Sequence, residues 1–188
     1  MDIKIISGTD RPNSNALKIS AYIKPLYEAK DASVEIIDLQ DFPLGDVVGG
    51  KYGKNLPSVT EFIKPVIEAD GLIFVIPEYN GSYPGILKLF IDYLPFPESF
   101  KMMPIAFIGE SKGAFGGLRA VEQFQMVVNY RNALQFPESL YISRVHKEFS
   151  EEDGLKDDFQ QKLLLSQMKN FVKFIKAINH KKIEQLDN

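Results

Sequence analysis

Three stretches of the sequence combine residue types that bind small polar ligands. The first, residues 7–15, contains Thr9, Arg11, Ser14 and Asn15. Short hydroxyl and amide groups, a fixed positive charge and the free N–H groups of a helix start can together bind a phosphate monoester without a metal ion. The same residues also fit an ordinary turn in which one side chain caps a helix, so this stretch alone leaves both interpretations open.

The second stretch, residues 77–85, places backbone groups between aromatic side chains. Its Asn80-Gly81 pair is a strong turn signal, and Tyr79 and Tyr83 lie on either side of that pair. A flat heteroaromatic ligand with donors and acceptors at its edge would fit such a surface. A plain turn whose tyrosines cover the edge of a sheet would have the same sequence.

The third stretch, residues 109–117, contains four glycines. Glycine lets a backbone approach a ligand closely, and we expect Gly116 and Gly117 to open the following helix. A mobile connector would also be rich in glycine. Three unusual loops at one sheet edge nevertheless favour a shared ligand site over three separate turns.

A fourth stretch imitates a nucleotide-binding motif. Residues 45–51 fit G-x-x-x-x-G-K, but Tyr52 cannot replace the Ser or Thr that would bind magnesium. The pattern predicts no strand entering this stretch and no helix leaving it. We therefore interpret it as a flexible loop within the long connection 39–56.

The apolar pattern predicts strands and helices in alternation. The expected strands are 3–7, 33–38, 71–77, 102–109 and 136–142, and the expected helices are 15–29, 57–69, 84–94, 116–132 and 157–179. Right-handed crossovers then give one α/β domain over residues 1–188. We expect a flavodoxin-like three-layer sandwich whose five-stranded parallel sheet has the order 2-1-3-4-5, with ligands bound at the carboxyl ends of strands 1 and 3. Pro25 and Pro65 fall inside expected helices, where we expect kinks or shortening.

Composition excludes several classes of function. The chain has no cysteine, only two histidines (His146 and His180) and a net charge of −3. We therefore expect no metal site, no nucleic-acid partner and no membrane span, and a cytoplasmic location. We expect no catalytic acid or base: His146 fits a surface or packing role, and Glu78 fits a cap or an ion-pair partner.

At the three loops the sequence resembles the NADPH-dependent FMN reductase family of flavodoxin-like proteins, and the resemblance covers nearly the whole chain. The most specific segment is residues 77–85 with the following Leu87-Lys88 and residues 91–94. Loop 109–117 and the acidic tail 149–155 also fit the family. The chain departs from the family pattern in having Thr9 for serine, no tryptophan near Tyr93, an insertion at Pro95-Phe96-Pro97 and an atypical segment 45–53.

The resemblance implies a role for each matching residue. The FMN phosphate would be bound by Thr9, Arg11, Ser14 and Asn15. The isoalloxazine ring would lie along Pro77, Glu78, Tyr79, Asn80 and Gly81, largely through their backbone groups, with Ser111 and Gly113 near its pyrimidine side.

The resemblance also implies a flavin oxidoreductase with ping-pong kinetics, in a homodimer or homotetramer. NADPH or NADH would reduce the bound FMN, and a quinone, an azo compound, a metal oxyanion or free flavin would reoxidise it. One alternative is an FMN-binding electron carrier or redox-sensing partner with little NAD(P)H turnover. True carriers of this fold are usually strongly acidic, and a charge of −3 argues mildly against one. Another alternative is a phosphate-binding module without flavin.

Overall fold

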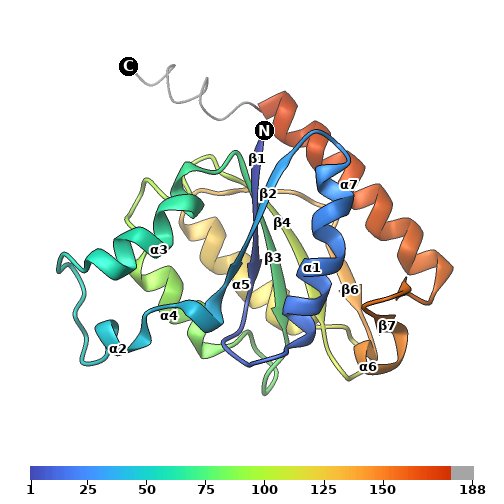
Figure 1. Cartoon of the computed structure of the whole chain (residues 1–188), viewed down its shortest axis with the longest axis horizontal. Coiled ribbons are helices and arrows are strands. Elements are labelled where there is room, and N and C mark those ends of the chain that lie inside the picture. Colours follow the sequence, from blue (N-terminus) through green and yellow to red (C-terminus); the bar gives the residue numbers. More distant parts are fainter. Residues whose placement is uncertain (179–188) are drawn as a thin grey trace.

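A central parallel sheet organises the computed structural model, which describes residues 1–178 (Figure 1). Its strands lie in the order β2-β1-β3-β4-β5, and β6 pairs with β4 beyond the end of β5. The order is the one that the sequence predicts, so the flavodoxin-like fold is confirmed. The strands are β1 (Asp2–Ser7), β2 (Ser33–Asp38), β3 (Gly71–Pro77), β4 (Pro104–Glu110), β5 (Leu134–Gln135) and β6 (Leu140–Ile142).

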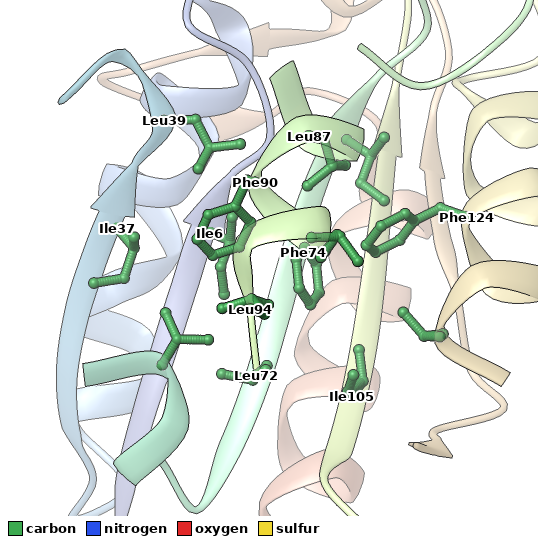
Figure 2. Close-up of a cluster of buried hydrophobic side chains, with 14 of the residues drawn as sticks. Ile6, Ile37, Leu39, Leu72, Phe74, Leu87, Phe90, Leu94, Ile105 and Phe124 are labelled. Carbon is green, nitrogen blue, oxygen red and sulfur yellow. The ribbon is translucent and has the colours of Figure 1, made fainter. Parts of the chain in front are cut away.

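Helices cover both faces of this sheet. Side chains of α1 (Asn15–Glu28) and α7 (Asp158–Ile178) pack on one face, and those of α3 (Pro57–Glu68), α4 (Gly85–Tyr93) and α5 (Leu118–Tyr130) pack on the other. Strand β3 contributes side chains to the core on both faces of the sheet, because its alternate residues point to opposite faces. Figure 2 shows Phe74 of β3 between the helices on the second face, close to Phe90 and Phe124.

The expected strand 136–142 is confirmed only at its end, over residues 140–142 (β6), and a separate short strand, β5, lies just before the expected range. β5 pairs with the start of β4, and β6 pairs with its end. Pro137 lies between the two short strands and has no N–H to donate to a ladder. The break lets Ile142 of β6 lie beside Glu110, where β4 ends.

The predicted helix boundaries need two corrections. Neither α1 nor α3 is shortened at its proline: each helix continues three residues beyond Pro25 or Pro65, so the ring interrupts only the last turn. Gly116 and Gly117 do not open α5, because their φ angles of 59° and 84° are left-handed. The predicted end of the last helix at residue 179 lies outside the described residues.

The connection 39–56 is also more ordered than predicted. It contains a 3₁₀ turn (Leu39–Asp41) and the short helix α2 (Leu44–Val47), so the flexible-loop interpretation is wrong for this part. Three buried side chains, Leu39, Phe42 and Val47, fix it to the core. After β6, the chain forms α6 (Val145–Glu148) and a small hairpin of β7 (Phe149–Ser150) and β8 (Gly154–Leu155). Within residues 1–178, every helix is too short or too polar to span a bilayer.

Arg131 holds the turn that follows α4, including the start of the proline insertion. The residue is 7% exposed, and its guanidinium donates hydrogen bonds to the backbone carbonyls of Ile91, Leu94 and Pro95 and to the hydroxyl of Ser99. These acceptors are mostly shielded from water. The cation therefore adds donors to a turn whose own hydrogen bonds run from the Leu94 N–H to Ile91 and from the Ser99 N–H to Pro95.

We predict that Arg131→Ala lowers the free energy of unfolding by about 3 kcal/mol, because it removes four hydrogen bonds that are buried or partly buried. Urea denaturation measures the change. Lys88→Ala is the matched control: it removes an exposed ion pair with Asp92 and should cost about 0.5 kcal/mol or less. A loss below about 1 kcal/mol in Arg131→Ala would show that the turn holds without this side chain.

Candidate functional site

A polar cavity of about 520 Å³ opens at the carboxyl ends of β1, β3 and β4. All three loops that the sequence singled out contribute to its wall. The lining residues are Arg11, Pro12, Asn13, Ser14, Asn15, Pro77, Glu78, Tyr79, Glu110, Ser111, Lys112 and His146. A second cavity of similar size, about 530 Å³, lies between α3 and α4, has a more apolar wall and is lined by none of these residues.

The first loop is tied to β3 before it reaches the cavity. The Gly8 N–H donates to the carbonyl of Val75 at 2.9 Å, and a Cβ on Gly8 would lie 2.8 Å from the same oxygen. Thr9 is fully buried: its hydroxyl shares a 3.1 Å hydrogen bond with the Tyr79 hydroxyl and accepts from the Arg11 N–H. Thr9 therefore shapes the loop and joins it to the second loop.

The amino-terminal end of α1 faces the cavity. Ser14 caps the helix by accepting a hydrogen bond from the Leu17 N–H, and Asn15 is the first helical residue. The first turn contains no acidic residue, so the positive end of the helix dipole is not neutralised there. Arg11 adds an exposed guanidinium to the same wall. This part of the cavity is suited to an anion.

The second loop is a tight turn fixed by α5. Tyr79 and Ser82 exchange two backbone hydrogen bonds, and Asn80 and Gly81 between them have left-handed φ angles of 52° and 77°. The Gln123 side chain donates to the Gly81 carbonyl at 2.9 Å and accepts from the Ser82 hydroxyl at 2.7 Å. Asn80 and Gly81 thus form the turn and do not line the cavity.

Glu78 forms the ion pair that its sequence position suggested. Its Oε1 lies 3.0 Å from the Nη1 of Arg119 on α5, and the guanidinium also lies 4.8 Å from the centre of the Phe115 ring. The pair connects the second loop to the first turn of α5. It therefore fixes the carboxylate at the cavity wall.

The third loop is held by the chain that follows β6. The N–H of Ser111 donates to the Ile142 carbonyl, and the Gly113 carbonyl accepts from the Arg144 N–H. These contacts bring exposed His146 to the cavity, a position that the sequence did not predict. Gly113 itself does not line the cavity.

The closing glycines of the third loop approach the protein itself. A Cβ on Gly117 would lie 2.7 Å from the backbone nitrogen of Glu110, and one on Gly116 would lie 2.7 Å from the carbonyl carbon of Tyr141. Glycine is thus required where α5 begins beside β4. These close contacts within the protein explain why glycine occurs at both positions, whereas we had expected the glycines to allow close approach of a ligand.

Glu110 is a second cavity residue, besides His146, that the sequence did not predict. It is the last residue of β4 and is only 5% exposed, and its side chain hydrogen-bonds to Asn15. Burial raises the pKa of this carboxyl to about 7, although Asn15, Lys112 and Arg11 each act to lower it. The available signal was a carboxylate that directly follows a buried apolar strand.

The structure brings most of the predicted ligand residues to one wall. Arg11, Ser14, Asn15, Pro77, Glu78, Tyr79 and Ser111 line the cavity. Thr9, Asn80, Gly81 and Gly113 lie in the same loops but outside the lining. No set of three acidic, histidine or cysteine side chains within residues 1–178 is arranged to hold a metal ion.

We predict that Glu110 makes the ligand-free protein less stable as pH rises. The carboxyl ionises near pH 4.5 when unfolded and near 7 when folded, so the native state binds more protons between these values. Its contribution should lower the free energy of unfolding by up to about 3 kcal/mol between pH 5 and 8.

Urea denaturation of wild type and Glu110→Gln at both pH values isolates this contribution. The variant should gain stability relative to wild type at pH 8. Glu122→Gln, an exposed change on α5, should show no such gain. An equal stability difference between wild type and Glu110→Gln at both pH values would contradict the prediction.

Comparison with known proteins identifies the family. The family model described as NADPH-dependent FMN reductase matches residues 1–147. An NAD(P)H-dependent FMN reductase of Pseudomonas aeruginosa is 33% identical over 178 residues, covering 89% of this chain and 92% of that protein. An FMN-dependent NADPH-azoreductase of Staphylococcus saprophyticus is 37% identical over 116 residues, and this match spans only 58% of this chain and 60% of the azoreductase.

Solved structures agree on the fold. The flavoenzyme FerB, an NAD(P)H:acceptor oxidoreductase of Paracoccus denitrificans, superposes with a TM-score of 0.76 at 21% identity, covering 94% of this chain and 97% of FerB. Flavodoxin 1 of Bacillus cereus superposes with a TM-score of 0.61 at 17% identity, covering 92% and 98%. The resemblance drawn from the loops is therefore confirmed: the chain belongs to the NADPH-dependent FMN reductase family, whose cofactors are FMN and NADPH.

Proposed function

We propose that the protein is an FMN-dependent oxidoreductase that takes reducing equivalents from NAD(P)H and passes them, in a ping-pong cycle, to a small oxidant. Candidate oxidants are a quinone, an azo compound, a metal oxyanion or free flavin. The observation that carries the proposal is the polar cavity at the carboxyl ends of β1, β3 and β4, whose wall combines a side suited to an anion with the side chains of Pro77 and Tyr79. The names of the Pseudomonas and Staphylococcus relatives support it.

The donor set of the cavity fits FMN. A phosphate would be held by the Arg11 guanidinium, by Ser14 and Asn15 and by the positive end of α1. The ring would lie against Pro77 and Tyr79. Bound FMN would supply the hydride chemistry, which the protein's own side chains lack.

The backbone hydrogen bonds of the second loop limit which of its groups could contact the ring. The Glu78 N–H donates to the Glu110 carbonyl at 3.1 Å, and the Tyr79 N–H donates to Ser82. Both amides are therefore already used within the protein. The ring would contact these residues through their side chains and carbonyl oxygens.

We propose a homodimer or a homotetramer in the cytoplasm. Exposed apolar side chains support a subunit contact on the α4–α5 side, where the rings of Phe96 and Tyr130 stack 6.0 Å apart and Met126 is exposed.

We predict that Arg11→Ala weakens FMN binding by about 10- to 100-fold, because a charged hydrogen bond to phosphate contributes about 1.5–3 kcal/mol. Fluorescence titration of the flavin-free protein measures the change. Riboflavin, which lacks the phosphate, should bind both proteins equally. Lys64→Ala, a distant exposed cation on α3, is the charge-matched control. If FMN affinity is the same in Arg11→Ala and wild type, the phosphate is bound elsewhere.

We predict that NADPH or NADH reduces the FMN-loaded protein under anaerobic conditions and that a quinone reoxidises it. Steady-state rates at several quinone concentrations should give parallel double-reciprocal lines, because the two substrates react in separate steps. Intersecting lines would refute the ping-pong cycle. FMN binding with negligible turnover would instead favour the electron carrier.

A further inference from the structure

Glu110 places a carboxyl group where the proposed function requires an anion to bind. It ends β4 on the cavity wall and is held on both sides: the Glu78 N–H donates to its backbone carbonyl, and its side chain hydrogen-bonds to Asn15. With an exposure of 5%, the side chain has little room to turn into solvent. A negative charge on Glu110 would therefore remain inside the cavity.

Two of the groups that face Glu110, Arg11 and Asn15, are ones that we propose hold the phosphate. Arg11 from the first loop and Lys112 from the third loop act on the carboxyl electrostatically, and Asn15 comes from α1. Ionised Glu110 would occupy Asn15 and would offset the charge of both cations. A neutral carboxyl would leave the cations to the ligand and would itself become a hydrogen-bond donor.

The other charged groups near the cavity do not offset the repulsion between an ionised Glu110 and a bound phosphate. Glu78 on the β3 side is paired with Arg119, so that cation is already engaged. His146 of α6 lines the cavity but is exposed to solvent. Asp10, in the first loop, is exposed.

We propose that Glu110 is a cofactor-site residue that must be neutral when FMN is bound, so that FMN binding draws one proton from solvent onto its carboxyl group. The proposal rests on the proposed function, because it takes FMN as the ligand. It adds a residue to the site and makes cofactor affinity depend on pH. Cofactor would be held less tightly as the pH rises above neutrality.

The expected dependence follows from the carboxyl's pKa of about 7 in the ligand-free protein. If only the neutral form binds, the FMN dissociation constant rises about eightfold between pH 6.5 and 8. At pH 7.5, each bound FMN takes up about 0.8 proton. The second ionisation of the FMN phosphate occurs near pH 6 and is common to every variant, so comparison between variants removes it.

Isothermal titration calorimetry of the flavin-free protein with FMN tests the proposal. Titrations at pH 6.5 and 8 give the dissociation constants, and titrations at pH 7.5 in two buffers of different ionisation enthalpy give the proton uptake. Wild type should show the eightfold change and the uptake of 0.8 proton. Glu110→Gln should change less than twofold and take up almost no proton. Riboflavin should bind wild type with less than a twofold change, because it lacks the phosphate.

Asp10→Asn is the matched control, since it removes an exposed carboxylate from the first loop, next to Arg11 in the sequence. It should keep the pH dependence of wild type even if its affinity differs at both pH values. Equal pH dependence in wild type and Glu110→Gln would overturn the proposal, as would equal dependence for FMN and riboflavin. If Glu110→Gln does not fold, absence of proton uptake by wild type would overturn it alone. Failure of wild type to bind FMN at either pH would instead overturn the proposed function.

Discussion

The site depends on hydrogen bonds that extend the parallel ladder past the ends of the strands. The Gly8 N–H donates to Val75, the Glu78 N–H to Glu110, and the Ser111 N–H to Ile142. Each loop is therefore hydrogen-bonded to the adjacent strand before it turns away from the sheet. The positions of the cavity-lining loops are therefore set by the buried central strands of the sheet.

This constraint also explains why polar groups are buried beside the cavity. A residue that continues a buried strand is shielded from water, so Thr9 must share its hydroxyl with Tyr79, and Glu110 needs Asn15. Thr9 satisfies its polar group through a neighbouring loop. Glu110 does so only in part, because its carboxyl still titrates near neutrality. The same edge of the sheet thus contains a hydroxyl group whose hydrogen bonds are satisfied within the protein and a carboxyl group whose protonation changes with pH.

Most of the fold could be predicted from the sequence, because the core strands are continuous apolar runs and the helices have a clear period. The three loops were recognisable for the same reason: each directly follows such a strand. Side-chain partners across distant segments were not recognisable. Neither the four acceptors of Arg131 nor the position of His146 at the cavity leaves a local pattern. The glycines of the third loop were misleading, because close contact with Glu110 requires glycine just as contact with a ligand would.

The division of the last strand at Pro137 has a consequence for how the molecule behaves at high concentration. A long, regular outer strand presents a row of unpaired amides on which another sheet can grow, and this is a common route to aggregation. Here that margin consists of β5 and β6, two and three residues long, with a residue between them that has no amide hydrogen. On the opposite margin, Glu35 of β2 is exposed and paired with Lys4. The β5–β6 margin therefore offers little template for another sheet, and the longer β2 margin carries an exposed charged side chain.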